Sequence, residues 1–385
     1  MATPLRARNA VLLTFAVNGF GFASWAPRIP DIRADLALTP GELGRTLLAG
    51  ALGSVLALPF AGRVITAIGA ARTVAVGVVL GALGLLLLGS GLDLLASRVA
   101  VMAGIFVIAV GISLWDVSMN HEGAAVEQQL GRTIMPVFHA FFSGGTVLGA
   151  LAAASLVALE VPVLAHLFGA SVLVLLAGLW STRAFLEHDL TPEAEASTTR
   201  SASAWREPRT LVIGLVVLVA ALTEGTANDW IAVAVTDGHD QPGWVGVLAF
   251  ATFLAAMTAG RLLGAGLLDR FGRVPVLRVL FGCAALGSLL VVFGTTSLAF
   301  VGVVLWGVGA SLGFPAGMSA AADEPARAAA RLSVVSTIGY MAFIVGPPLL
   351  GLLGDHVGVL RSLLLVGLLA VPAFLAVPAV RERTS

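Results

Sequence analysis

The sequence predicts an all-α membrane protein in which twelve transmembrane helices form two pseudo-symmetric six-helix bundles. The chain of 385 residues is 58% hydrophobic and 11% charged, with a mean hydropathy of +0.98. A soluble domain would carry about a quarter charged residues. Apolar runs such as Val74–Gly91 approach the roughly 20 residues that a spanning helix needs. The two halves also repeat each other, so we expect one duplicated bundle. A transmembrane β-barrel would instead show short alternating segments.

Twelve apolar runs are long enough to cross a bilayer, and each is expected to form one helix. They lie near residues 9–27, 41–65, 73–91, 97–119, 133–157, 162–184, 209–234, 244–267, 275–294, 298–320, 331–353 and 357–380. The longest polar stretch, 187–208, is rich in Ser, Thr, Ala and acidic residues and is expected to be a linker. The N-terminal bundle would then cover 1–186 and the C-terminal bundle 209–385.

The placement of the arginines predicts the orientation of the chain in the membrane. All 22 basic residues are arginine. If both termini are cytoplasmic, only five lie on the outer side, which leaves 17 (22 − 5) on the cytoplasmic side. The outer five are Arg28, Arg33, Arg45, Arg98 and Arg361. The positive-inside rule therefore predicts cytoplasmic termini and a cytoplasmic linker.

Several function classes are disfavoured by composition. The absence of lysine excludes a Walker A loop and a Schiff-base enzyme. The single cysteine, Cys283, cannot form an internal disulfide. No catalytic or metal-binding constellation emerges, so we expect no enzyme activity, cofactor or metal, and no basic tail suggests nucleic acid. The expected partners are a small-molecule substrate, a proton or another ion, and the lipid bilayer, with the chain acting as a monomer.

Short motifs recur between the two halves at a nearly constant offset. "PGELG" from Pro40 recurs as "PGWVG" from Pro242, 202 residues later, and "VGISL" from Val110 recurs as "VGASL" from Val308, 198 residues later. Six spans plus six, joined by a cytoplasmic linker, is the plan of the major facilitator transporters.

One loop strengthens this resemblance. "GLLDRFGR", Gly266–Arg273, resembles the loop signature of the major facilitator superfamily. The resemblance implies a cytoplasmic latch at a helix end, made by Asp269, Arg270 and Arg273. The equivalent stretch of the first half has Thr66 where the acid should be.

Four further stretches resemble the MosC-like and YbjJ-like group of bacterial inner-membrane proteins within that superfamily. They are "SWAPRIPDIR" (Ser24–Arg33), "DVSMNHEGAAVE" (Asp116–Glu127), "FHAFFSGG" (Phe138–Gly145) and "EGTANDW" (Glu224–Trp230). The resemblance implies a multi-pass protein of the cytoplasmic (inner) membrane and a small polar solute of the sugar, polyol or amine class.

Ionisable residues inside spans are costly and usually face a pathway. Asp116 and Asn120 share one face of the fourth span, and His139 and Ser143 share one face of the fifth span at a similar depth. We expect Asp116 and His139 to carry protons, although a packing histidine bonded to a carbonyl is an open alternative. Asn120 and Ser143 beside them are expected to contact the substrate. Glu122 and Glu127 follow on the fourth span, and we expect them to lie at its solvated end.

Glu224 is the principal proton-carrier candidate, because it lies near the predicted midplane of the seventh span. Asn228 and Trp230 follow it as substrate contacts. Further substrate contacts, for which packing is the alternative, are expected at Asn18, Trp25, Trp306 and Tyr340.

Charges just outside the first span, at Arg28, Asp31 and Arg33, suggest either mutual pairing in the solvated headgroup zone or an external gate that closes against Asp229 or Asp237. Arg261 lies within the eighth span, and we expect its side chain to reach toward the cytoplasmic side.

These observations favour a secondary transporter that works by alternating access and is driven by protons. A multidrug/proton exporter is the alternative, although the Gly-Pro pair typical of the fifth span of those exporters stands here in the eleventh span, at Gly346-Pro347. A non-transporting membrane sensor of the same fold is the second alternative.

Overall fold

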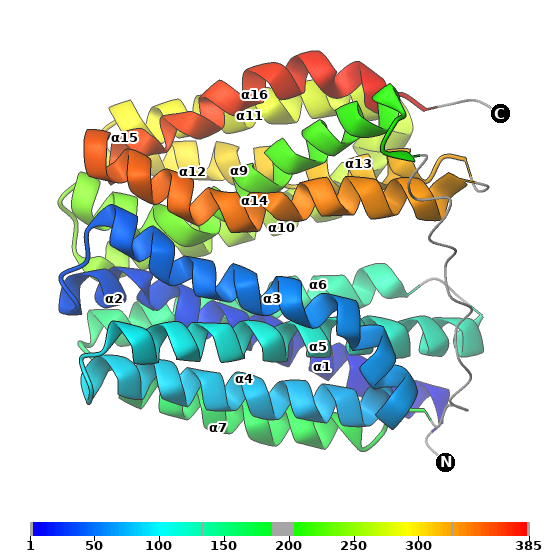
Figure 1. Ribbon diagram of the computed structural model, residues 1–385, viewed down its shortest axis with the longest axis horizontal. Helices are drawn as coiled ribbons and strands as arrows, with labels where there is room; N and C mark the ends of the chain where they lie inside the picture. The colour runs from blue at the N-terminus through cyan, green and yellow to red at the C-terminus, as the bar shows by residue number, and fades with distance from the viewer. Residues whose placement is uncertain (1–2, 132–133, 187–203, 325–326, 383–385) are drawn as a thin grey trace. The chain divides into compact units, whose positions relative to one another are not determined.

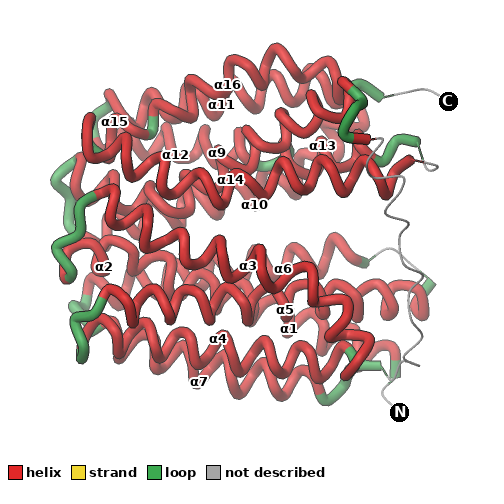
Figure 2. The backbone as a smooth tube through the Cα atoms, in the orientation of Figure 1, coloured by secondary structure: helices red, strands yellow, loops and turns green. Residues whose placement is uncertain are grey.

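The computed structural model describes residues 3–131, 134–186, 204–324 and 327–382. Helices and the turns between them make up the described chain (Figure 2). Twelve of its helical segments are long and apolar enough to cross a membrane, which confirms the predicted number of spans. Most of the predicted linker, residues 187–203, lies outside the described residues.

The chain folds into two compact units. Unit 1 comprises Met1–Glu193 with Gly243–Leu248, and unit 2 comprises Ala194–Pro242 with Ala249–Ser385. The first four helical elements of unit 1 include the first two spans. They are α1 (Pro4–Trp25), the 3₁₀ turn η1 (Ala26–Arg28), α2 (Ile29–Asp35) and α3 (Pro40–Ile68).

The rest of unit 1 contains four long helices (Figure 1). They are α4 (Ala70–Asp93), α5 (Arg98–Leu130), α6 (Met135–Ala158) and α7 (Val163–Thr182). The helix α5 continues 11 residues past the predicted end of the fourth span at residue 119 (130 − 119). It ends where Gly131 adopts the left-handed conformation that terminates many helices.

Unit 2 contains the other six spans, except for the first residues of α10, Gly243–Leu248, which belong to unit 1. Its elements are α9 (Pro208–Gly238), α10 (Gly243–Phe271), α11 (Arg273–Phe293), α12 (Thr296–Ala310), α13 (Gly313–Ala321), α14 (Ala328–Val357), α15 (Val359–Ser362), α16 (Leu364–Ala376) and the 3₁₀ turn η3 (Val377–Val380). The tenth span is broken at Ser311 and Leu312 into α12 and α13, and this break matters for the site below.

The two units use the same helix pairs, which supports the predicted duplication. In unit 1, α1 packs against α6, α4 against α5, and α4 against α7. In unit 2, the equivalent spans pack in the same way: α9 against α14, α11 against α12, and α11 against α16. Gly69 (φ 86°) ends α3, and Gly272 (φ 75°) ends α10 at the equivalent turn. A positive φ of this kind favours glycine, which explains why both halves keep it.

Each unit has its own apolar core. The core of unit 1 is built around Phe15, Trp115 and Phe138, and that of unit 2 around Val217, Leu277 and Phe281. Glycines permit the close approach of α1 and α6: a Cβ added at Gly145 would collide with the carbonyl oxygen of Ala16, and one at Gly19 with that of Phe142. Small residues at helix contacts are typical of membrane helices, which associate through close packing rather than a hydrophobic driving force.

Candidate functional site

The strongest candidate site lies within unit 2, where Glu224 at the middle of α9 pairs with Arg261, 18 residues after the start of α10 (261 − 243) and 10 before its end (271 − 261). Nη2 of Arg261 on α10 donates to Oε2 of Glu224 on α9 at 2.9 Å. Glu224 lies 16 residues after the start of α9 at residue 208 and 14 before its end at residue 238. The side chains are 22% exposed for Glu224 and 35% for Arg261, so neither is sealed in dry packing.

The break in the tenth span positions the arginine of this pair. Since Ser311 caps α12, its carbonyl group has no helical continuation, and it accepts a hydrogen bond from Nε of Arg261 at 3.2 Å. Gly260 lets α10 approach this break, because a Cβ there would lie 2.7 Å from the Cβ and Oγ atoms of Ser311. The predicted reach of Arg261 toward the cytoplasmic side is wrong: the side chain is held between Glu224 and Ser311.

A buried tryptophan fixes the helix that carries Glu224. Nε1 of Trp306 on α12 donates to the carbonyl oxygen of Thr223 at 3.0 Å, and its ring packs edge-on against Phe253. Trp306 is fully buried, as the packing alternative expects. It holds the backbone next to Glu224 and so helps to set the position of the carboxylate.

The polar residues that follow on α9 have separate surroundings. Asn228 and Asp229 are half-buried, and the Oδ1 atom of Asn228 has no hydrogen-bond partner within the described chain. Trp230 is fully buried, and its ring belongs to the packed interior. Tyr340 on α14 is 39% exposed and lies against Phe343 with a centroid distance of 6.3 Å.

In unit 1, the predicted site residues divide into two local groups. Nδ2 of Asn120 donates to the carbonyl oxygen of Asp116 at 2.9 Å and lies 3.4 Å from its Oδ1, so these two side chains share one face of α5 as predicted. His139 on α6 is exposed and meets the ring of Phe15 edge-on at 5.2 Å. Ser143 is buried one turn further along α6.

The predicted contacts on the first span are more deeply placed. Asn18 is 1% exposed, and its Nδ2 lies 3.6 Å from Sδ of Met119 on α5, while its Oδ1 has no partner within the described chain. Trp25 is half-buried and packs edge-on against Phe22. Asn18 is therefore a polar group in the interior of unit 1, with one acceptor unfilled.

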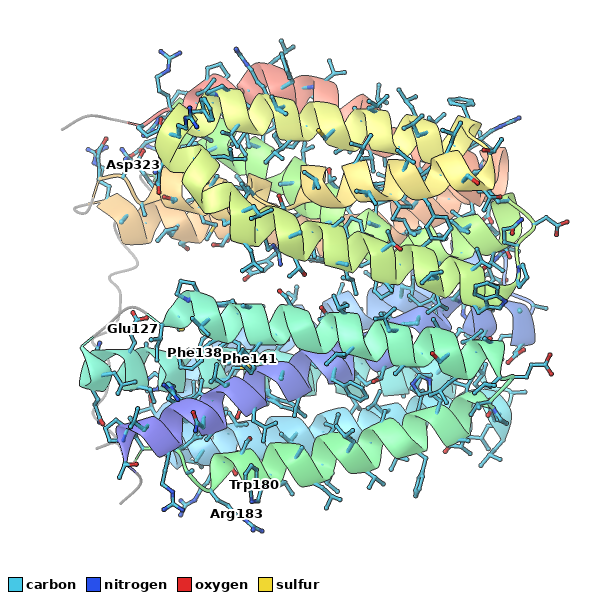
Figure 3. All side chains as sticks on the ribbon, turned by 180° about the vertical axis from the view of Figure 1, so that it is seen from behind. Glu127, Phe138, Phe141, Trp180, Arg183 and Asp323 are labelled. Atoms are coloured by element: carbon cyan, nitrogen blue, oxygen red, sulfur yellow. The ribbon has the colours of Figure 1, made fainter. Side chains whose placement is uncertain are left out.

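The predicted solvated end of the fourth span is wrong for Glu122. Glu122 is fully buried, and its Oε1 accepts from the backbone N–H of Leu186 at 2.6 Å. Glu127 is half-buried, and its Oε2 accepts from the backbone N–H groups of Ile134 and Met135, both at 2.7 Å (Figure 3). Glu127 thereby satisfies donors at the start of α6, where a helix leaves N–H groups unpaired and favours negative charge.

Arg28 of the outer charge cluster is buried, whereas Asp31 and Arg33 are partly exposed. Arg28 is 2% exposed and donates to Asp31 at 3.2 Å, to Nδ1 of His166 at 3.0 Å and to the carbonyl oxygen of Val161 at 3.1 Å. The predicted pairing of Arg28 with Asp31 is present, but in the interior of unit 1, where it ties η1 to the start of α7. Arg33 is half-buried.

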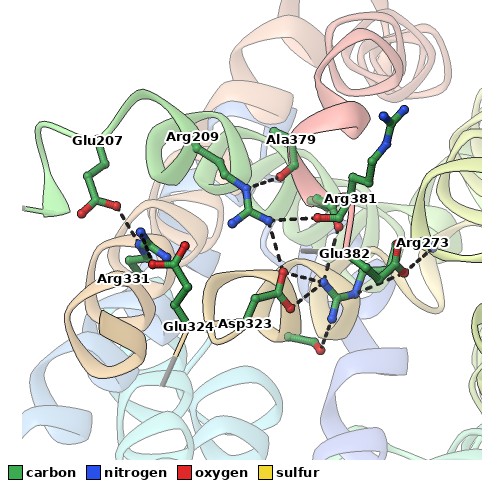
Figure 4. Close-up of polar contacts among 11 residues, drawn as sticks. Glu207, Arg209, Arg273, Asp323, Glu324, Arg331, Ala379, Arg381 and Glu382 are labelled. Atoms are coloured by element: carbon green, nitrogen blue, oxygen red, sulfur yellow. Dashed lines mark hydrogen bonds and ion pairs between the residues drawn. The ribbon is translucent and has the colours of Figure 1, made fainter. Parts of the chain in front are cut away.

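The predicted latch of Asp269, Arg270 and Arg273 has a different acid. Asp269 is exposed and forms no ion pair within the described chain, and Arg270 lies over the ring of Phe271 at 5.1 Å. Nη1 of Arg273 instead donates to both carboxylate oxygens of Asp323, at 2.8 and 3.0 Å (Figure 4). The carboxylate that Arg273 binds therefore comes from the loop after α13, and not from Asp269 as expected.

Asp323 is the centre of a wider network that the sequence analysis missed. Nη2 of Arg209 donates to Asp323 at 3.2 Å and to the carbonyl oxygen of Arg381 at 3.0 Å, while Nε of Arg209 donates to that of Ala379 at 2.9 Å (Figure 4). The backbone N–H of Arg273 donates to Glu382 at 2.8 Å. The only sign of this network in the sequence is the pair Asp323 and Glu324, which follows the end of the tenth span and precedes Arg327 and Arg331.

A second part of this network begins at the start of α9. Glu207 accepts from Nε of Arg331 at 2.7 Å, from Nη1 of Arg327 at 2.9 Å and from the hydroxyl of Thr210 at 3.0 Å. Nη2 of Arg331 also lies 3.2 Å from Oε2 of Glu324. Burial alone would raise the pKa of Glu207, but the hydrogen bonds and positive charges outweigh burial and lower the pKa below its ordinary value.

The described residues contain no group of three or more His, Cys, Asp or Glu side chains that could hold a metal ion. Glu224 and Arg261 place a hydrogen-bond acceptor and donors inside the spans.

Comparison with known proteins gives concordant results. A sequence model of the Major Facilitator Superfamily matches residues 213–385. The chain is 30% identical to an uncharacterised transporter, y4wD, of Sinorhizobium fredii over 99% of both chains. It is 31% identical to an uncharacterised MFS-type transporter of Yersinia pestis, over 89% of this chain and 88% of that one. The membrane protein MosC of Rhizobium meliloti is 26% identical, over 93% and 86%.

Solved structures share the fold at low identity. The nucleoside transporter NupG, as a crystallised mutant, has a TM-score of 0.80 with 14% identity and covers 96% of this chain and 99% of its own. A bacterial homologue of the lysosomal transporter Spinster has a TM-score of 0.75 with 14% identity over the whole of both chains. At this identity, the likeness concerns the twelve-helix fold.

Proposed function

Because this chain belongs to the major facilitator superfamily of transporters, we propose that it is a secondary active transporter that moves a small polar solute by alternating access, driven by protons. The solute would cross the cytoplasmic membrane, with both termini of the chain on the cytoplasmic side. The ion pair of Glu224, at the middle of α9, with Arg261 on α10 is the observation that supports this proposal most directly.

The reason is the cost of charge in a membrane. A single charged side chain at the centre of a span costs about 3 kcal/mol or more. A pair of opposite charges offsets part of this cost, but apolar residues at both positions would avoid it altogether. An ion pair between the middle of α9 and α10 is therefore expected to have a function, and both of its side chains are partly exposed.

Proton coupling follows from the geometry of the pair. When Glu224 takes up a proton, its charge is lost and Arg261 loses its counter-charge. Arg261 can then donate to an oxygen of a solute, while the neutral Glu224 can still donate or accept one hydrogen bond. Return of the proton to water restores the ion pair and competes with the solute for Arg261. Solute and proton would thus be linked through one arginine.

The same pair suggests the solute class. Arg261 offers hydrogen-bond donors, and Glu224, to which it is hydrogen-bonded, offers acceptors. Donors and acceptors so close together suit a solute with several hydroxyl groups, such as a sugar or a polyol. An amine would instead bind at the carboxylate. The half-buried Asn228, one turn along α9, adds an amide whose Oδ1 has no partner within the described residues.

Transport into proteoliposomes tests this proposal. A thermal-shift panel of sugars, polyols, amines and nucleosides would first identify a ligand. Wild-type protein is expected to accumulate that ligand under an imposed proton gradient and to lose accumulation with a protonophore. Glu224→Gln is expected to abolish gradient-driven accumulation but to retain solute exchange without a gradient, since glutamine keeps the volume and can accept from Arg261.

The matched control is Asp240→Asn, which neutralises an exposed carboxyl just beyond the end of the same helix. It is expected to transport as the wild type does. If Glu224→Gln accumulates the ligand under a proton gradient as well as the wild type, Glu224 has no role in coupling and the proposal fails. A transporter with no response to any proton gradient would contradict proton coupling as a whole.

A further inference from the structure

A separate pocket lies in unit 1, where the start of α1 meets the end of α7. It has a volume of about 560 Å³ and is lined by Arg6, Asn9, Ala10, Trp180, Ser181, Arg183 and Ala184. Its floor is fixed, because the hydroxyl of Thr14 on α1 donates to that of Ser181 on α7 at 2.7 Å, and Ser181 donates to the carbonyl oxygen of Gly178. The volume is in the range of small-molecule sites.

The pocket is lined by two positively charged side chains and therefore suits an anion. Arg6 and Arg183 are both exposed, and neither forms an ion pair with a carboxylate within the described chain. Asn9 accepts two hydrogen bonds from Arg8 through its Oδ1, at 3.1 and 2.9 Å, which leaves its Nδ2 group as a donor toward the pocket and brings a third positive charge close by. Guanidinium groups bind phosphate oxygens through paired hydrogen bonds.

An apolar stripe on α7 leads to the pocket. Phe168, Val172, Leu176 and Trp180 follow each other at steps of four residues and are 57%, 40%, 66% and 63% exposed. Steps of four place them on one face of the helix. The stripe is about 18 Å long at 1.5 Å per residue, which is the length scale of an acyl chain in one leaflet. Trp180 ends it, and Arg183 stands one turn beyond (Figure 3).

We propose that this pocket binds the headgroup of an anionic phospholipid, whose acyl chain lies along the α7 stripe. The phosphate would accept from Arg6 and Arg183, with Asn9 as a further donor. Trp180 would lie at the level of the headgroups, where tryptophan is enriched in membrane proteins. A free phosphate ester could use the same donors, but it has no acyl chain to lie along the adjoining stripe. This inference does not depend on the solute or on the coupling ion.

Fluorescence quenching by brominated lipids tests the proposal on the purified full chain. The signal of Trp180 is the difference between each protein and the same protein with Trp180→Phe. The protein is titrated with brominated phosphatidylglycerol or brominated phosphatidylcholine in a background of unlabelled phosphatidylcholine. Each arginine near a membrane surface is expected to contribute about fivefold, so half-maximal quenching should need roughly 30-fold less of the anionic lipid.

Three further arms decide the result. The double variant Arg6→Gln with Arg183→Gln should lose the preference, whereas Arg63→Gln, an exposed arginine near the end of α3 in the same unit, should keep it. Circular dichroism and the Tm in phosphatidylcholine show whether the double variant is folded. If it is not, each single variant is expected to lose about fivefold. Equal quenching by both lipids, or a preference that survives the substitutions at Arg6 and Arg183, overturns the proposal. Displacement of the anionic lipid by about 10 mM glycerol phosphate would instead assign the pocket to a free phosphate ester.

Discussion

Neutralising Asp323 is expected to destabilise unit 2 strongly. Its side chain is 10% exposed and accepts three hydrogen bonds from two arginines: two from Arg273, at 2.8 and 3.0 Å, and one from Arg209, at 3.2 Å. Asp323→Asn removes the carboxylate that both arginines share and places an amide NH₂ group against their donors. The side chains of Arg209 and Arg273 are 20% and 15% exposed, so water can replace the lost contact only in part.

The magnitude follows from these surroundings. Removing one partner of a buried ion pair costs about 3–5 kcal/mol. Arg209 keeps two carbonyl acceptors, and Arg273 keeps the hydroxyl of Ser319 at 2.9 Å, so we reduce this figure to about 2–3 kcal/mol. For a unit of this size, the Tm should then fall by about 5 °C or more.

The assay is thermal unfolding of the purified protein in detergent, followed by circular dichroism at a fixed heating rate. Asp269→Asn is the matched control, because this exposed carboxylate of the loop signature has no ion pair within the described chain. It should leave the Tm within about 1 °C, as surface substitutions usually do. A double-mutant cycle with Arg209→Gln should show a coupling energy above about 0.5 kcal/mol. If the Tm of Asp323→Asn equals that of Asp269→Asn, the Asp323 network does not stabilise unit 2 and this reasoning is refuted.

Three more predictions concern other parts of the chain. Glu127→Gln should lower the free energy of unfolding by about 1 kcal/mol, because the amide group of glutamine caps the start of α6 less strongly than a carboxylate does. Chemical denaturation measures this free energy, and an unchanged value would contradict the capping role of Glu127. Gly145→Ala should prevent α1 and α6 from packing and sharply reduce the yield of monodisperse protein, whereas Gly144→Ala, where an added Cβ meets open space, should not; equal yields would contradict the close approach. Glu207 has a lowered pKa in the folded chain, so its contribution to stability is present above its ordinary pKa of 4.5 and is lost as the pH falls through the lower folded value. Between about pH 6 and about pH 3 the Tm of Glu207→Gln should therefore fall less than that of the wild type, and parallel curves would contradict this assignment.

The sequence by itself determined the number of spans and the duplication of the bundle. Both follow from properties that add up along the chain: the bilayer sets the length of each apolar run, and repeated motifs mark equivalent helices. The position of Glu224 along its span was readable for the same reason, since counting residues from a span end gives depth. The family resemblance also rested on local stretches such as Gly266–Arg273, and the relatives confirm it.

Only the tertiary structure decided which partner each charge has. Hydrophobic periodicity gives the face of a helix but not its rotation against a neighbour, so Arg261 could not be matched to Glu224 before α9 and α10 were packed. The break at Ser311, which supplies a carbonyl acceptor to Arg261, has no counterpart in the first half, where the same motif continues as an unbroken helix. The latch acid changed from Asp269 to Asp323, because the exposed face of α10 carries Asp269 while the loop after α13 returns to Arg273. Burial of a charge depends on what packs over it, and this information lies in residues far away in the sequence.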